Sequence, residues 1–235
     1  MVGNSSSIPP RTIPLAARSH RRDFVELAVA YGLILTVIWM PRPWQKMLWW
    51  VAAAVILAIA TTSFEGLQAM GLRRENFLRS FWTVGLASLA SAVAVVLAVR
   101  LHTLHVPGTP LLFIKTYAGY ILWTFVQQLL MQCFFLSRLL RLLPSPKLAA
   151  LVTAVIFAVA HQPNPILVPV TLLWGLAACL LFLRYHNLYT LALAHAILGV
   201  TLTITVPGPV NHNMRVGLGY LTYAHTHRTA LSAQP

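Results

Sequence analysis

Acidic residues are nearly absent from this sequence, and charged residues of either sign are few. The 235 residues include 4 Asp and Glu together, and charged side chains make up 9% of the chain. Soluble globular domains contain about 25% charged residues, so an ordinary soluble domain is excluded. The shortage of acids also leaves few carboxylates to pair with polar groups elsewhere in the chain. The acids are Asp23, Glu26, Glu65 and Glu75.

Cysteines, a cleavable leader and a continuous basic patch are also scarce or missing. Cys133 and Cys179 are the two cysteines, and both lie in apolar stretches, which does not indicate a disulfide framework. The N-terminus is polar and basic through Arg22, without a short apolar run and cleavage site, which argues against a cleaved signal peptide. The 17 Lys and Arg give a formal net charge of +13, but they are spread between apolar runs, so no nucleic-acid partner is expected.

Long apolar runs dominate the rest of the sequence. Hydrophobic residues make up 58% of the chain, and the mean hydropathy is +0.72. A transmembrane helix needs about 20 mainly apolar residues. By that criterion we predict seven membrane segments: Asp23–Met40, Met47–Thr62, Phe77–Val99, Pro110–Leu136, Leu148–Ala160, Ile166–Leu183 and Leu188–Val206.

This pattern predicts an all-α fold, a polytopic transmembrane helix bundle of about seven helices. An eighth is expected if the fourth run is broken or the C-terminal tail packs back. We expect one membrane domain over residues 23–206, between a polar basic tail (1–22) and a polar C-terminal tail (207–235). Basic residues gather before the first segment and after the second, fourth and sixth, which predicts a cytoplasmic N-terminus in the cell membrane. The lipid bilayer is therefore an expected partner, and the oligomeric state stays open.

Five polar side chains interrupt the apolar segments. Gln127, Gln128 and Gln132 lie in the fourth segment, His161 follows the fifth, and His195 lies inside the seventh. Such groups are costly in hydrocarbon and are functional candidates by default. The glutamines have the alternative role of tying helices together, each hydrogen bond being worth about 0.6 kcal/mol. His161 has the alternative role of capping helix carbonyls, whereas His195 needs a partner that offsets its desolvation.

The order and spacing of these residues resemble the CPBP family of intramembrane CAAX-type proteases, also called the Abi family. Its members carry Glu-Glu-x-x-x-Arg on one helix, Phe-x-x-x-His at the end of the next, and His-x-x-x-Asn or Asp on a later one. Phe157 and His161 match the second motif, and His195 matches the start of the third. The resemblance extends from Leu111 to Val206.

The first and third motifs differ from the family pattern. Gln127, Gln128 and Gln132 stand where the family has Glu, Glu and Arg, and Gly199 stands where it has Asn or Asp. The resemblance implies that the first glutamate and the second-motif histidine activate water, while the third-motif residues stabilise the oxyanion. A carboxylate accepts a proton from an attacking water, and a neutral glutamine does not. The variant motif keeps shape and hydrogen bonding but removes two negative charges and one positive charge.

Two functional hypotheses follow from this resemblance. In the first, the chain is a CAAX-type intramembrane endopeptidase that hydrolyses a peptide bond of a membrane-associated, for example prenylated, protein. His161 is then the base, Gln127 and Gln128 orient water or substrate, His195 donates to the oxyanion, and Gln132 completes the candidate site. In the second, the chain is a catalytically inactive member whose cavity binds a peptide, lipid or partner protein. A small transporter or channel is less supported, because no charged relay accompanies the polar residues.

Two other groups are candidates for activating water. His161 and His195 are candidate zinc ligands, with His212 as a third imidazole, since three histidines and an open position form a known type of zinc site. Glu65 is a candidate acid if the second helix continues to Met70, although a position in an interfacial loop is the preferred expectation.

Overall fold

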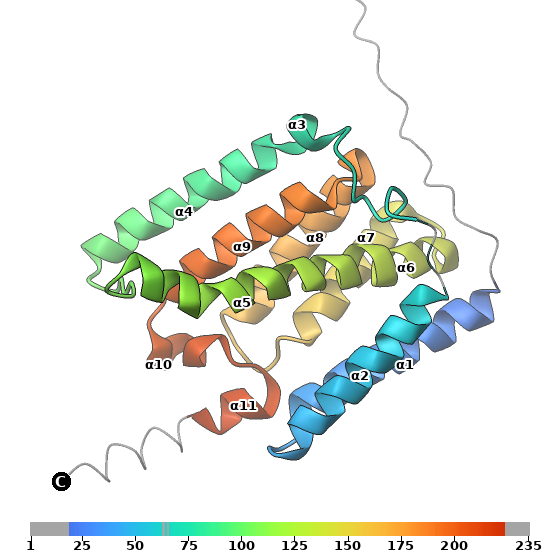
Figure 1. Ribbon diagram of the computed structural model, residues 1–235, viewed down its shortest axis with the longest axis horizontal. Coiled ribbons are helices and arrows are strands. Elements are labelled where there is room, and N and C mark those ends of the chain that lie inside the picture. Colours follow the sequence, from blue (N-terminus) through green and yellow to red (C-terminus); the bar gives the residue numbers. More distant parts are fainter. Residues whose placement is uncertain (1–18, 63, 65, 224–235) are drawn as a thin grey trace, which may run out of the picture.

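The computed structural model describes residues 19–62, 64 and 66–223, and every regular element within these ranges is helical (Figure 1). In chain order the elements are α1 (His20–Trp39), α2 (Trp44–Thr61), α3 (Phe77–Ser80), α4 (Trp82–Arg100), α5 (Pro110–Gln128), the π-helix η1 (Leu129–Leu136), α6 (Ser137–Leu142), α7 (Pro146–Val159), α8 (Leu167–Tyr185), α9 (Leu188–Thr205), α10 (Gly208–Asn211), the 3₁₀-helix η2 (His212–Met214) and α11 (Gly217–Leu221). The prediction of an all-α polytopic bundle is confirmed.

Five helices among the described residues are long and apolar enough to cross a membrane. They are Trp44–Thr61, Phe77–Arg100, Pro110–Leu142, Leu167–Tyr185 and Leu188–Thr205. α7 is apolar but shorter. Each of the seven predicted segments forms a helix, but α1 is not among the five. Arg21, Arg22, Asp23 and Glu26 bring four charges into its first turns, so that every membrane-length stretch of α1 contains several charged side chains.

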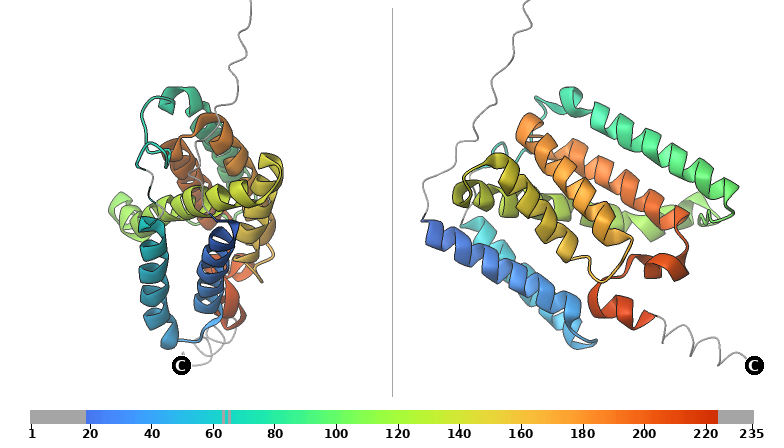
Figure 2. Two further views of the ribbon diagram at one scale, coloured as in Figure 1. Left: turned by 90° about the vertical axis from the view of Figure 1, so that its right-hand side faces the viewer. Right: turned by 180° about the vertical axis from the view of Figure 1, so that it is seen from behind.

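The main bundle consists of α4, α5, α7, α8 and α9, with the α1–α2 hairpin and α4 on opposite sides of the molecule (Figure 1). Figure 2 shows the same arrangement from behind. α9 packs against both α4 and α5, and α8 packs along α7. The two helices approach closely at Gly175, where an added Cβ would lie 3.3 Å from the Ala154 Cα. Outward-facing apolar side chains such as Leu122 and Leu173 are exposed, as expected for a surface that meets lipid.

Three helices of the bundle begin at a side-chain cap that the sequence supplies. The side chains of Thr109, Ser145 and Asn187 accept hydrogen bonds from the first-turn amides of α5, α7 and α9. Proline occupies the first helical turn of α5 and α7, where its missing N–H has no intrahelical partner to lose. These caps fix the first residue of each helix. They therefore also fix how far along the helix axis the later polar residues lie.

The segment after α9 packs back onto the bundle over its described part. Asn164, in the turn between α7 and α8, accepts hydrogen bonds from the first amides of α8 and donates to the backbone oxygens of Asn211 and Arg215. The Gly217 amide also donates to the Gln162 oxygen at 2.7 Å. The sequence left this packing open as an alternative to a separate polar tail, and residues 224–235 lie outside the described part of the chain.

Two ion pairs fasten the start of α1 to α6. Arg138 donates to Glu26 at 2.6 Å, and Arg141 donates to Asp23 at 2.7 Å. The Arg138 side chain is 1% exposed. Two of the chain's four acids are therefore held in ion pairs between α1 and α6.

Candidate active site

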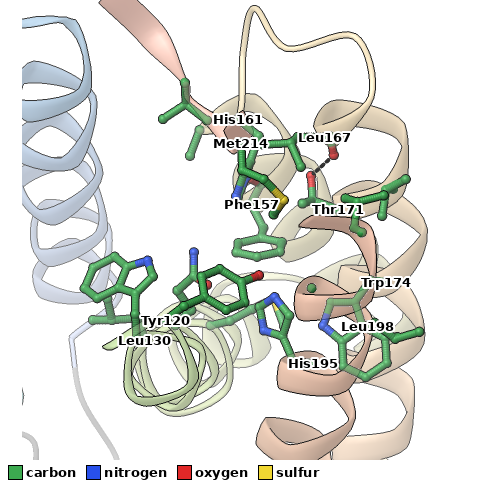
Figure 3. A pocket seen from close by; sticks show the side chains of 18 of the residues that line it. Tyr120, Leu130, Phe157, His161, Leu167, Thr171, Trp174, His195, Leu198 and Met214 are labelled. Atoms are coloured by element: carbon green, nitrogen blue, oxygen red, sulfur yellow. Dashed lines mark hydrogen bonds between the residues drawn. The ribbon is translucent and has the colours of Figure 1, made fainter. Parts of the chain in front are cut away.

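A cavity of about 620 Å³ lies among the helices, and residues from α1, α4, α5, η1, α7, α8, α9 and the segment 213–216 line it. Gln127, His161 and His195, three of the five predicted site residues, are among the lining residues. Figure 3 shows His161, His195 and the Phe157 ring around this space. The other two predicted residues, Gln128 and Gln132, do not line the cavity.

Gln128 and Gln132 lie behind the cavity wall and connect to His195. The Gln132 Nε2 donates to the Gln128 Oε1 at 3.2 Å, and the Gln128 Nε2 lies 3.2 Å from the His195 Nδ1. Both amides are buried, at 0% and 1% exposure. The i,i+4 pairing expected from the sequence is therefore present, although η1 is a π-helix from Leu129 onward. π-helical turns occur frequently at functional sites.

His161 is held as a proton acceptor facing the cavity. Its Nδ1 lies 2.7 Å from the Phe157 carbonyl oxygen, which can only accept, so the neutral ring carries its proton on Nδ1 and leaves the Nε2 lone pair free. His161 lies in the turn after α7, outside the membrane-spanning helices. Burial lowers its pKa from the ordinary 6.5, and the hydrogen bond to the Phe157 carbonyl partly opposes that shift. The imidazole is therefore neutral at pH 7.

His195 has the opposite arrangement of protons. With the Gln128 amide nitrogen facing it, the His195 Nδ1 accepts, so the neutral ring carries its proton on Nε2 and is a donor at that atom. The Phe157 ring lies beside both histidines, with centroid separations of 4.7 Å to His161 and 6.0 Å to His195. One imidazole of the cavity is thus an acceptor and the other a donor.

Among the residues that the structure describes, no Asp or Glu lines the cavity. Asp23 and Glu26 are engaged with α6, and Glu75 is exposed. Glu65, the alternative acid considered from the sequence, lies outside the described residues. The cavity wall therefore offers neutral donors and acceptors.

Part of the chain is similar to a known protein family. Residues 109–201 match the model of the type II CAAX prenyl endopeptidase Rce1-like family. The match contains all five predicted site residues and confirms the resemblance drawn from the motifs. No curated protein and no solved structure matches the chain significantly.

The residues around this cavity do not form the three-histidine zinc site considered from the sequence. Within the described ranges, no group of three or more His, Cys, Asp or Glu side chains is arranged to hold a metal ion. His212 is absent from the cavity lining and stacks on Tyr220 and Tyr223, with ring centroids 3.9 and 4.7 Å away. His161 and His195 therefore lack the third imidazole that the sequence suggested.

Two aromatic residues of the cavity wall were not predicted from the sequence. Tyr120 and Trp174 line the cavity, and both are labelled in Figure 3. The Trp174 ring lies 5.7 Å from His195 between centroids, and its Nε1 is buried without a hydrogen-bond partner among the residues described. Tyr120 lies two helical turns before Gln127, so the helical repeat could have placed both on one face of α5. Nothing in the local sequence distinguishes Trp174 from other apolar residues of α8.

Proposed function

We propose that this chain is an intramembrane endopeptidase that hydrolyses a peptide bond of a membrane-associated protein, with His161 as the base. The observation that carries the proposal is the pair of histidines with opposite hydrogen-bonding roles in one cavity. His161 presents a lone pair at Nε2, and His195 presents an N–H. General-base catalysis needs an acceptor near the attacking water, and the oxyanion needs a donor.

In the proposed reaction, the His161 Nε2 takes a proton from a water molecule as the water oxygen bonds to the scissile carbonyl carbon. The carbonyl oxygen becomes an oxyanion that the His195 Nε2–H stabilises. The C–N bond then breaks, and the proton held on His161 passes to the leaving amine nitrogen. The products are a carboxylic acid and an amine, and His161 returns to its neutral form.

The glutamines have separate roles in this proposal. Gln127 lines the cavity and orients the water or the peptide. Gln128 acts through His195, because its amide fixes the ring orientation and the tautomer that donates. Gln132 holds the Gln128 carboxamide in place. This assignment gives each amide a role that needs no charge.

The proposed substrate is a protein tethered to the membrane, prenylated or otherwise lipid-modified. A largely apolar cavity suits a lipid-modified peptide, and the family whose model residues 109–201 match is described as CAAX prenyl endopeptidases. Membrane-spanning helices and this family make the chain an integral membrane protein. The choice of substrate within that class is part of the proposal.

We also propose that the N-terminus faces the cytoplasm of the cell membrane. Contacts that support this topology join basic residues near the ends of different helices: Arg22 with Thr62, Arg73 with the His186 oxygen, and Arg141 with Asp23. Arg22 and Arg141 therefore lie at the start of α1, and Arg73 lies at the end of α8. An excess of Lys and Arg on one side is typical of the cytoplasmic face.

A second candidate function is a catalytically inactive family member that binds a peptide or lipid. The specific observation in its favour is that the lining of the cavity includes no carboxylate, while the first motif has amides in place of two glutamates. Such a protein would hold its ligand without turning it over.

Cleavage of a farnesylated CAAX-type peptide by the purified protein in nanodiscs separates the two functions. We expect cleavage by the wild type and a loss of about 10²-fold or more in His161→Ala and in His195→Ala, the range that general acid–base groups contribute. His105→Ala is the matched control, because His105 is an exposed histidine outside the cavity lining, and its activity should equal that of the wild type.

Two results would contradict the endopeptidase proposal. An inactive wild type that gains cleavage with Gln127→Glu and Gln128→Glu together would favour the inactive binding protein. Cleavage that is unchanged in His161→Ala would remove His161 from the role of base. Thermal unfolding of each variant in the same nanodiscs checks that lost activity does not reflect lost folding.

A further inference from the structure

Gly199 has no side chain at the position where related proteases carry the last residue of their third motif. It lies one turn after His195 on α9, so the two positions share a helix face. A Cβ built on Gly199 would overlap the Tyr120 hydroxyl, with the ring atoms Cζ and Cε1 at 2.7 and 2.8 Å. Cβ atoms essentially never approach other atoms so closely. Tyr120 on α5 therefore fills the volume that an Asn or Asp at position 199 would need.

The Tyr120 hydroxyl is chemically suited to replace that missing side chain. A phenol O–H donates a hydrogen bond, as an asparagine amide does. Among the described residues the hydroxyl has no hydrogen-bond partner, and Tyr120 lines the same cavity as His195. Figure 3 shows the phenol pointing into the cavity between α5 and α9, toward His195. An uncommitted donor therefore lies one helical turn from the His195 ring.

We propose that Tyr120 and His195 together bind the scissile carbonyl oxygen of the peptide. His195 donates from Nε2, and Tyr120 donates from its hydroxyl across the gap that Gly199 leaves. The third motif has no amide at position 199, and Tyr120 supplies a donor from a different helix instead. Gly199 makes this possible because its missing side chain leaves room for the Tyr120 ring. The inference rests on the proposed function, because it names how that same cavity holds its substrate.

Infrared spectroscopy of an isotope-labelled peptide tests this contact directly. The probe is a farnesylated CAAX-type peptide with ¹³C=O at the prenylated cysteine, bound to protein carrying His161→Ala so that it stays intact. Each hydrogen bond to a carbonyl lowers its stretching frequency. Tyr120→Phe keeps the ring and removes the donor, so the labelled band should move to higher frequency. Tyr117→Phe is the matched control, because it removes a phenol hydroxyl from the same helix at a residue that does not line the cavity, and it should leave the band in place.

Turnover by otherwise wild-type protein provides the second measurement. Loss of one oxyanion donor lowers kcat by about 10²–10³-fold in known cases, so Tyr120→Phe should lose that much kcat with KM changed by less than about threefold. Gly199→Asn should also be impaired, because its side chain meets Tyr120. Combining Gly199→Asn with Tyr120→Ala should recover activity to within about tenfold of the wild type, since an amide then occupies the vacated space.

The outcomes separate this inference from the function on which it rests. If the peptide binds and is cleaved, but Tyr120→Phe changes neither the band nor kcat, the inference fails while the proposed function stands. Full activity of Gly199→Asn would also overturn the inference, because the new side chain and the Tyr120 ring would then both fit between α5 and α9. If the wild type neither binds nor cleaves the peptide, the proposed function itself fails, and the Tyr120 assignment fails with it.

Discussion

At the scale of single residues, the site depends on which ring nitrogen of each histidine carries a proton. Backbone and amide contacts decide this, through Phe157 for His161 and Gln128 for His195. The Gln128 amide donates to the His195 Nδ1 and so holds the tautomer that is protonated on Nε2, without adding a charge to the membrane interior. The Gln-Gln-x-x-x-Gln motif is thus compatible with catalysis by a histidine base.

The pH dependence of cleavage follows from the environment of His161. The active form is the neutral base, which is present above its pKa and is lost as the pH falls through that value. Because burial lowers the pKa of His161 below 6.5, the acid limb of kcat/KM should have its midpoint below pH 6.5. Steady-state cleavage of the farnesylated peptide across this range measures it. A midpoint above 6.5 would contradict the assignment.

At the scale of elements, the cavity is positioned by helices that approach one another closely. The α7–α8 pair brings Phe157 and Trp174 into the wall of one cavity, and the close approach of the two helices depends on small residues at Ala154 and Gly175. In membranes, helix association depends on such close packing because lipid supplies no hydrophobic driving force. The position of the second motif is therefore a consequence of the fit between α7 and α8.

Enlarging Gly175 should separate these helices. Gly175→Leu is expected to lower the free energy of unfolding by about 1–3 kcal/mol or more and to reduce cleavage, because the new side chain meets the Ala154 backbone. Chemical unfolding in detergent micelles measures the loss. Gly119→Leu on α5 is the matched control, since a Cβ there meets nothing within 4 Å. Equal losses in the two variants would rule out the packing explanation.

At the scale of the whole molecule, ion pairs at one end fasten the α1–α2 hairpin to the bundle. α1 contributes Tyr31, Ile34 and Ile38 to the cavity wall, so its attachment also shapes the site. Arg138 is buried and bonds Glu26 through two nitrogens, at 2.9 and 2.6 Å. Removing one partner of a buried pair leaves the other charge without its compensation, whereas removing both avoids that cost.

Arg138→Met is accordingly expected to destabilise the protein by about 3–5 kcal/mol, and the double variant with Glu26→Leu should recover part of that loss. Unfolding in detergent micelles is the measurement. Arg79→Met, at an exposed arginine, should change stability by less than about 0.5 kcal/mol. A double variant that is less stable than Arg138→Met alone would contradict this explanation, because removing Glu26 as well would then cost stability rather than restore it.

The sequence alone determined the helical architecture and the positions of the polar residues along it. Apolar runs of membrane length, caps such as Ser145 and turns such as Pro163-Asn164-Pro165 are local signals, so the helices were predictable from neighbouring residues. The motif order also predicted that Gln127, His161 and His195 would belong together. The predicted segment Asp23–Met40 is the helix α1, and its first turns contain more charged residues than any of the five long apolar helices.

Tertiary structure decided which polar groups face the cavity and what each one contacts. Gln127 and Gln128 are neighbours in sequence, yet one lines the cavity and the other bonds His195 from behind, because helix rotation separates them. Tyr120 and Gly199 are 79 positions apart by their numbers, and only the packing of α5 on α9 reveals that one fills the space of the other. Contacts between distant segments depend on how helices pack, and local sequence patterns do not encode that packing residue by residue.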